Sequence, residues 1–382
     1  MCGLCGEITF DGSPASVEAI EAMTCAMVPR GPDAGGIVSR GSFAFGHRRL
    51  RIIDLSERGQ QPMVDSELGI TLVFNGCIYN HKELRAELET KGYRFFSTSD
   101  TEVVLKSWHA WGREAPRRFN GMFAFVVCER DTGRVAMGRD RLGIKPLYYS
   151  KTDKRVRFAS TLPALVSAGD VDTALDPVGL ALYMTFHAVV PPPHTILRGI
   201  RKLPAATLRV IEPDGTFKDE QYWDLSFKRS AEDLATSDSE WKDRVGATLR
   251  RAVDRRMIAD VPVGVLLSGG VDSSLIVGLL AEAGQQHLKT FSIGFEAAHG
   301  EAGDEFIYSD IIAKHFGTDH TKIMIPTSDM LEALPQTIAA MSEPMVSYDN
   351  VGFYLLSREV AKLSLIHISE PTRQESRSRM PS

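Results

Sequence analysis

The sequence lacks the features of a membrane-spanning, secreted or nucleic-acid-binding protein. No stretch approaches the roughly 20 consecutive apolar residues that span a bilayer, and no basic segment followed by an apolar run opens the chain. Lysine and arginine total 44 against 49 acidic residues, a net charge of -5 without a block of like charge. We therefore expect small, soluble substrates and neither a nucleic-acid nor a membrane partner.

A disulfide framework is also missing. The cysteines are an odd and scattered set of five in a chain of 382 residues that is 43% hydrophobic and large enough to bury a core without covalent staples. This usage is typical of a reducing compartment, so we expect a cytoplasmic protein.

Two architectures follow each other along the chain. Up to about Ala168, short strands punctuated by glycine and aspartate are interrupted by three helices with apolar residues at three- and four-residue spacing, which predicts an α+β domain. After a polar run at 228–239, a helix, an apolar run at 261–267, a helix at 274–283 and a strand at 290–295 predict a parallel sheet. We expect a first domain at 1–210, a linker at 211–240 and a second domain at 241–362.

Cys2 is the first candidate catalytic residue. A small residue at position 2 permits removal of Met1, which leaves a cysteine with a free α-amine whose pKa lies near 7.7 to 8.0, suited to accept the thiol proton. The alternative is that Cys2 is an incidental early cysteine, or that it forms half of a zinc or redox site with Cys5. No second cysteine pair completes a zinc site, and no strand precedes Cys2 as a redox motif ordinarily requires.

Further motifs follow Cys2 in order. Taken singly, each has an ordinary explanation: Arg49 as a surface ion pair, Asp100 as a helix N-cap, and Asn75-Gly76 as a type I′ hairpin turn. Their ordered occurrence behind an N-terminal Cys-Gly favours a function for all of them. The motifs are Arg30-Gly31-Pro32-Asp33, Gly46-His47-Arg48-Arg49-Leu50, Gln61-Pro62, Asn75-Gly76-Cys77-Ile78-Tyr79-Asn80 and Ser99-Asp100-Thr101-Glu102.

With these motifs, residues 2–149 resemble the class II glutamine amidotransferase domain of the glutamine-hydrolysing asparagine synthetase family. The resemblance implies an N-terminal-nucleophile αββα sandwich with Cys2 as the nucleophile. It implies that Asn75 and Gly76 form the oxyanion hole, that Arg49 binds the α-carboxylate of glutamine, and that Asp100 binds the α-ammonium.

Cys77 departs from the usual family pattern. Most members carry glutamate there, which helps to recognise the amino end of glutamine, whereas NGCIYN resembles a narrower branch, the N-acetylglutaminylglutamine amidotransferases. The segment 186–204 is similar to that branch too. The acceptor that the resemblance implies is therefore aspartate or N-acetylglutaminylglutamine.

A second candidate site lies between the apolar run at 261–267 and the next helix. Glycines that let the backbone approach a phosphate, serine hydroxyls and a helix N-terminus are the elements of an anion site, and Asp272 is suited to hold Mg²⁺. The alternative is a Gly-Gly turn before a capped helix, and the lysine of a Walker A loop is absent. The residues are Leu267, Ser268, Gly269, Gly270, Val271, Asp272, Ser273 and Ser274.

This segment resembles the pyrophosphate loop of the ATP pyrophosphatases. The resemblance implies ATP and Mg²⁺ as cofactors, Asp272 as a metal ligand, and positions flanking the nucleotide for Leu267 and Ile293. It also implies an α/β parallel-sheet domain, incomplete here because the second glycine-acid loop of the family, SGxGxDE, is missing.

The last twenty residues, 363–382, lose the periodic pattern and resemble the translation of a sequencing-library adapter. We expect them to be a non-native tail. The resemblance as a whole implies a glutamine-dependent, ATP-consuming amidoligase that acts on small molecules, and a homodimer is a further expectation. A glutaminase alone, or an inactive fragment that binds glutamine and nucleotide, is the alternative that the missing loop leaves open.

Overall fold

The computed structural model describes residues 1–285, 287–296, 306–347 and 349–362. The expected tail at 363–382 lies outside the described residues. The chain divides into two compact units, Met1–Leu225 and a second that begins at Ser226.

The first unit is built on two six-stranded sheets, with strand orders β10-β8-β9-β1-β3-β2 and β12-β11-β7-β6-β5-β4. All the strand pairs in these sheets are antiparallel. The strands are β1 (Gly3–Thr9), β2 (Ala34–Arg40), β3 (Phe43–Arg49), β4 (Met63–Asp65), β5 (Ile70–Ile78), β6 (Gly121–Glu129), β7 (Val135–Arg139), β8 (Tyr148–Lys151), β9 (Arg155–Ala159), β10 (Arg201–Lys202), β11 (Thr207–Ile211) and β12 (Phe217–Gln221).

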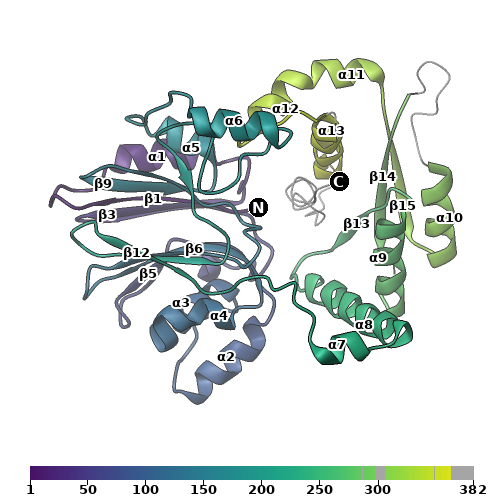
Figure 1. Ribbon diagram of the computed structural model, residues 1–382, viewed down its shortest axis with the longest axis horizontal. Coiled ribbons are helices and arrows are strands. Elements are labelled where there is room, and N and C mark those ends of the chain that lie inside the picture. The colour runs from purple at the N-terminus through teal and green to yellow at the C-terminus, as the bar shows by residue number, and fades with distance from the viewer. Residues whose placement is uncertain (286, 297–305, 348, 363–382) are drawn as a thin grey trace. The chain divides into compact units, whose positions relative to one another are not determined.

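Helices cover the outer faces of both sheets, which gives the expected four-layer αββα sandwich (Figure 1). One core cluster lies between the sheets and includes Leu4, Phe45, Val73 and Met137. Two others lie between a sheet and its helices, around Ile20 on one side and around the helix that carries Val104 on the other. The helices are α1 (Val17–Ala26), α2 (His81–Thr90), α3 (Asp100–Trp111), α4 (Ala115–Arg118), α5 (Leu162–Ser167) and α6 (Pro177–Thr185), with short 3₁₀ turns at Glu57–Gly59 and Gly112–Glu114.

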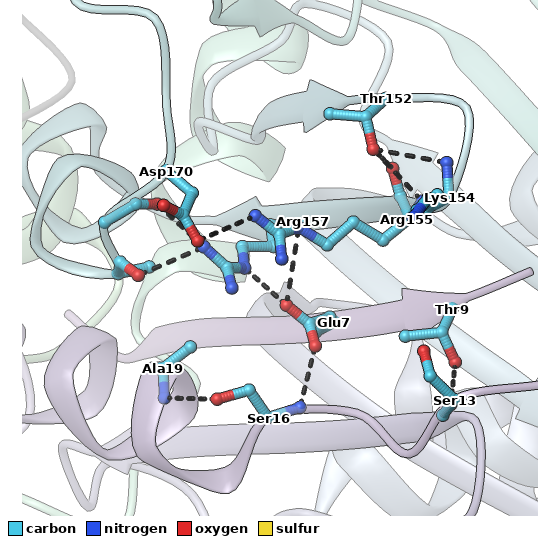
Figure 2. A network of polar contacts seen from close by, with 12 residues as sticks. Glu7, Thr9, Ser13, Ser16, Ala19, Thr152, Lys154, Arg155, Arg157 and Asp170 are labelled. Carbon is cyan, nitrogen blue, oxygen red and sulfur yellow. Dashed lines mark hydrogen bonds and ion pairs between the residues drawn. The ribbon is translucent and has the colours of Figure 1, made fainter. Parts of the chain in front are cut away.

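A buried ion-pair network fastens β1 to its surroundings (Figure 2). Glu7, 2% exposed, accepts a hydrogen bond from the backbone N–H of Ser16 at 2.7 Å and pairs with Arg157 on β9, which is 4% exposed. Arg157 also donates to the carbonyls of Ala168 and Gly169 at 3.0 and 2.8 Å. The network therefore fixes the strand that follows Cys2 to α1 and to the segment after α5.

The second unit has helices on both faces of a parallel three-stranded sheet, in the order β13-β14-β15. One core cluster joins the sheet to α8, α9 and α10, and another packs α13 against residues such as Phe291. The elements are α7 (Ala231–Ala235), α8 (Asp238–Arg256), β13 (Gly264–Leu266), α9 (Val271–Glu282), β14 (Lys289–Phe295), α10 (Phe306–Phe316), β15 (Asp319–Ile325), α11 (Thr327–Glu332), α12 (Leu334–Ala340) and α13 (Asp349–Lys362). No helix in the described ranges is both long and apolar enough to cross a membrane.

The structure differs from the expected linker at 211–240. Strand β12 pairs with β11 and belongs to the first sandwich, which extends to Leu225 rather than ending at 210. The rest of the expected linker contains helix α7 and the start of helix α8. A capping box begins each helix, with Ser230 as the N-cap of α7 and Ser237 as the N-cap of α8. Strand β12 exposes most of its side chains, so its sequence carries no apolar pattern. For this reason the sequence predicted a linker where the structure has a strand.

Replacing Arg157 by methionine should destabilise the first unit by about 3 kcal/mol, because buried Glu7 would lose its close charge partner and keep only the pair with Arg155 at 3.9 Å. Urea unfolding measures the effect. The matched control is R134M, which breaks an exposed pair with Glu212 and should change the stability far less. Equal losses in the two variants would contradict the importance given to burial.

Candidate functional site

The ends of β1 and β3 bring the candidate nucleophile next to the candidate carboxylate-binding arginine. Gly3 pairs with Arg48, so Cys2 lies beside the end of β3. The Cys2 Sγ accepts a hydrogen bond from the Leu50 N–H at 3.4 Å and lies 3.6 Å from the Leu50 carbonyl oxygen. Arg49 interacts electrostatically with Cys2, so the nucleophile is near a buried cation.

Arg49 is buried rather than a surface ion pair, since only 3% of it is exposed. Its guanidinium donates to the backbone carbonyls of Ser56 at 2.8 Å, Ile53 at 3.4 Å and Asp54. Burial lowers the pKa of Arg49 below its ordinary value. Arg49 therefore organises the loop after β3, and its contact with a glutamine carboxylate stays a prediction.

Asn75 and Gly76 lie inside strand β5 and not in a hairpin turn. The Asn75 side chain is 1% exposed, and its Nδ2 has no hydrogen-bond partner in the described part of the chain. Gly76 has no room for a side chain, because a Cβ there would lie 2.3 Å from the Met122 carbonyl oxygen. A buried amide donor without a partner is rare in proteins and is a feature expected of an oxyanion hole.

The Gly76 N–H points away from β6. Its neighbour across the ladder, Phe123, uses its own N–H and carbonyl for Asp140, so Gly76 and Phe123 form a non-hydrogen-bonded pair. On the edge of β5 that Gly76 faces, β4 pairs only as far as Leu72. Beyond it, side chains take over: the Phe74 N–H donates to Gln61 Oε1 at 2.6 Å and the Ile78 N–H to Asp100 Oδ2 at 3.0 Å. Gly76 lies between these two positions.

Asp100 is the first residue of α3, and the N-cap is its neighbour Ser99. Asp100 is 4% exposed, and burial raises the pKa of its carboxyl group to about 6, although the Ile78 N–H and the charge of Arg49 lower it. Arg49 thus interacts electrostatically with both Cys2 and Asp100, and the Ile78 hydrogen bond ties Asp100 to β5, the strand that carries Asn75, Gly76 and Cys77.

Cations surround the N-terminus of the chain. Burial lowers the pKa of the Met1 amine to about 5, and the positive charges of Arg30 and Lys145 lower it further. Arg30 Nε donates to the Cys2 carbonyl at 3.2 Å, and Lys145 is 5% exposed. An amine in this environment is neutral at pH 7, the state that accepts a proton.

Cys5 takes no part in this site. Its thiol is fully buried against Thr24, at 3.5 Å from Oγ1, and burial raises the pKa of Cys5 to about 12. No group of three or more His, Cys, Asp or Glu side chains that could hold a metal occurs among the residues that the structure describes. The zinc and redox alternatives for Cys2 and Cys5 have no structural support.

The second candidate site is the loop between β13 and α9. Gly269 has a left-handed backbone with φ of 83°, and a Cβ there would lie 2.6 Å from the Tyr308 Cβ. The loop is braced from within, since Ser268 Oγ lies 3.1 Å from Ser273 Oγ and accepts from the Gly270 N–H at 3.3 Å. A backbone cradle of this shape leads directly into a helix N-terminus.

The residues of this loop fit an anionic ligand. Gly270 caps α9 without a side-chain hydrogen bond, and the Ser274 Oγ is buried without a partner within the described ranges. Val271 is 84% exposed, while Leu267 is fully buried and packs in the core of the unit. Ile293 lies on β14 and is half-buried. A nucleotide-flanking role for Leu267 and Ile293 stays a prediction.

Comparison with known proteins gives a matching family model for each part of the chain. A family model described as a glutamine amidotransferase domain matches residues 1–223, and one described as asparagine synthase matches 244–369. Two Bacillus subtilis proteins named asparagine synthetase [glutamine-hydrolyzing] 1 and 3 are 34% and 30% identical over 97% of this chain. A Methanocaldococcus jannaschii relative, provisionally given the same family name, is 33% identical over 97% of this chain and 73% of its own length.

The chain belongs to the glutamine-hydrolysing asparagine synthetase family. It spans 57% and 61% of the two Bacillus subtilis members, so it corresponds to under two thirds of their length. A solved structure of a glutamine phosphoribosylpyrophosphate amidotransferase from B. subtilis is 16% identical, covers 87% of this chain and 92% of its own, and has a TM-score of 0.46.

Sequence reasoning found the family motifs but not the residues that support them. Arg30 was only part of a motif, and its contact with the Cys2 carbonyl was not foreseen. Asp140 accepts from the N–H groups of Leu142, Ile144 and Lys145 and so shapes the loop that carries Lys145 to the N-terminus. In an Asx turn, an aspartate side chain accepts hydrogen bonds from backbone N–H groups that follow it in the chain. Asp140, an aspartate that directly follows a strand, was the available signal for such a turn.

Replacing Asp100 by asparagine should stabilise the first unit at pH 7. Its folded pKa of about 6 lies above the ordinary 3.8, so folding favours the protonated form, and stability is lost as the pH rises from about 4 to about 6. We expect a gain of about 1 to 3 kcal/mol at pH 7 that disappears as the pH falls to 4. Urea unfolding of both proteins at several pH values tests this, and a loss of stability at pH 7 would contradict it.

Replacing Gly269 by alanine should disrupt the loop, because the new Cβ meets Tyr308 and the backbone is left-handed. The matched control is G284A, where φ is 80° but nothing lies within 4 Å, so only the backbone cost of about 1 to 2 kcal/mol applies. We expect a clearly larger loss of thermal stability in G269A. Indistinguishable melting curves would show that the close contact is unimportant.

Proposed function

We propose that the protein is a glutamine-dependent, ATP-consuming amidoligase in which Cys2 releases ammonia from glutamine. The observation that carries the proposal is that Cys2 lies at the end of β3 beside buried Arg49, while buried Asp100 is bonded to β5, the strand that presents a buried amide donor without a described partner, Asn75 Nδ2. Membership of the family supports the same reaction.

In the proposed mechanism, removal of Met1 gives the free α-amine to Cys2. The surroundings that keep the Met1 amine neutral would do the same for the new amine, so it can accept the thiol proton. The sulfur then attacks the γ-carboxamide carbon of glutamine. The ammonium returns its proton to the departing nitrogen, ammonia leaves, and the γ-glutamyl thioester is hydrolysed to glutamate.

The oxyanion of the tetrahedral intermediate would lie between Asn75 Nδ2 and the Gly76 N–H. Both donors can bind the oxyanion without first breaking a hydrogen bond that the structure describes. Asn75 Nδ2 has no described partner, and the Gly76 N–H faces the edge of β5 beyond the last residue that pairs with β4. Loss of one such donor typically costs about 2.7 to 4 kcal/mol in catalysis.

Opposite charges would recognise the α-amino-acid end of glutamine. Arg49 supplies a guanidinium for the carboxylate, and Asp100 supplies a carboxylate for the ammonium, since its pKa of about 6 leaves it mostly ionised at pH 7. Cys77 is half-buried on β5 and stands where the family pattern usually has glutamate. Asp100 therefore carries the ammonium contact with less help from a second acid.

We propose ATP as the ligand of the β13–α9 loop, with the pyrophosphate held by backbone N–H groups and the hydroxyls of Ser268, Ser273 and Ser274. The left-handed Gly269 and the buried Ser274 Oγ without a described partner support an anion there. Asp272 would hold Mg²⁺ together with phosphate oxygens, since Mg²⁺ needs few protein ligands in nucleotide sites. When bound, the metal would neutralise phosphate charge.

The proposed acceptor is an adenylylated carboxylate, either aspartate or N-acetylglutaminylglutamine. Cys77 in NGCIYN favours the second choice. A cytoplasmic location and a homodimer stay predictions. The domain limits stay proposals too, with the first unit now drawn to Leu225.

Replacing Cys2 by alanine should abolish glutamate formation from glutamine, because the proposed nucleophile is lost, and should spare amide formation from free ammonia in the full-length enzyme. An enzymatic glutamate assay and a product assay with ammonium salt measure the two reactions. The control is C25A, which removes an exposed thiol on α1 and should leave both rates unchanged. If C2A retained glutamine hydrolysis, or also lost ammonia use, the proposed division of labour would be wrong.

A further inference from the structure

One aspartate in the candidate glutamine site has an unusual backbone. Asp54, in the loop after β3, is 5% exposed and has φ of 56°, which places it in the left-handed region. Aspartate tolerates this region better than most residues, but a left-handed backbone persists only where the surroundings hold it. What holds Asp54 is a set of contacts in two directions.

The backbone of Asp54 faces Arg49 and its side chain faces a different segment. Its carbonyl accepts from Arg49 Nη2. One carboxylate oxygen, Oδ2, accepts from the Thr98 N–H at 2.8 Å, and the other, Oδ1, accepts from the N–H of Ser56 at 3.0 Å and from its hydroxyl. With this left-handed backbone, the Asp54 carbonyl contacts Arg49 while its carboxylate contacts Thr98 and Ser56.

The Thr98 contact leads to Asp100. Thr98 is followed by the N-cap Ser99 and then by Asp100, the first residue of α3. Asp100 in turn accepts from the Ile78 N–H on β5 and interacts electrostatically with Arg49. Asp54 therefore closes a ring of contacts that runs from β3 through two loops and the start of α3 to β5.

We propose that Asp54 is a positioning residue that fixes the spacing between Arg49 and Asp100 for the α-carboxylate and α-ammonium of glutamine. This inference rests on the proposed function. Asp54 touches neither reacting atom. It acts through the two residues that bind the ends of the amino acid, so its loss should weaken recognition of that part of the substrate and leave the thiol of Cys2 unaffected.

Two substitutions separate the backbone of Asp54 from its carboxylate. D54G keeps the left-handed conformation without steric cost and removes both carboxylate contacts. D54N also tolerates the conformation but retains one carbonyl oxygen, so it cannot accept from both Ser56 and Thr98 in the same way. D54N therefore provides a second test if D54G does not fold, as judged by its thermal unfolding curve.

The readout is inactivation of Cys2 by two reagents in the full chain. 6-Diazo-5-oxo-L-norleucine carries the α-carboxylate and α-ammonium of glutamine, whereas iodoacetamide carries neither. We expect the concentration for half-maximal inactivation by the glutamine analogue to rise at least about tenfold in D54G and less in D54N. The rate of alkylation by iodoacetamide should stay within about twofold of wild type.

The matched control is D170G, another aspartate with a left-handed backbone, φ 51°, whose side chain is largely exposed and pairs with Arg155 at 3.4 Å. It should behave as wild type toward both reagents. Unchanged inactivation of folded D54G and D54N by the analogue would overturn the role of Asp54 alone. A wild-type chain that reacts with iodoacetamide but not with the analogue would overturn the proposed function first.

Discussion

The buried guanidinium of Arg49 is the interaction on which the first unit's site depends. A charge that is 3% exposed needs compensation, and Arg49 finds it in the backbone carbonyls of the loop that follows it and in the carboxylate of Asp54. The loop is therefore folded around the arginine. Without that cation, neither the left-handed turn at Asp54 nor the buried acid at Asp100 has a reason to be there.

The same arrangement explains why the site costs stability. Asp100 has its pKa raised to about 6 by burial, and Asn75 keeps a buried donor without a described partner. In a protein selected only for stability, such groups would be neutral or paired. Their presence on α3 and β5 is what a site built to receive an amino acid and a developing oxyanion requires.

The sequence predicted the parts of the fold that have strong local patterns. The helix at 271–282 lies close to its expected position at 274–283, and the first unit contains the expected helices with apolar residues at helical spacing. Strand β2, which is rich in glycine and partly exposed, and strand β12, which is mostly exposed, carry little such pattern. The expected linker was too long for the same reason.

For the site, the motifs identified Cys2, Arg49, Asn75, Gly76 and Asp100, but not what connects them. The ordinary readings of Asn75-Gly76 as a turn and of Asp100 as an N-cap were decided only by the structure, because strand pairing and burial are tertiary properties. The link through Asp54 and Thr98 joins residues 44 positions apart in the sequence, so local reasoning could not find it.

The most direct test of the central claim is to mix the protein with glutamine, quench with acid and locate the adduct by mass spectrometry. The account predicts that Met1 is absent and that a γ-glutamyl group is attached to the peptide that begins with Cys2. Glutamate formation with Met1 retained, or with the glutamyl group on another cysteine or on none, would contradict it.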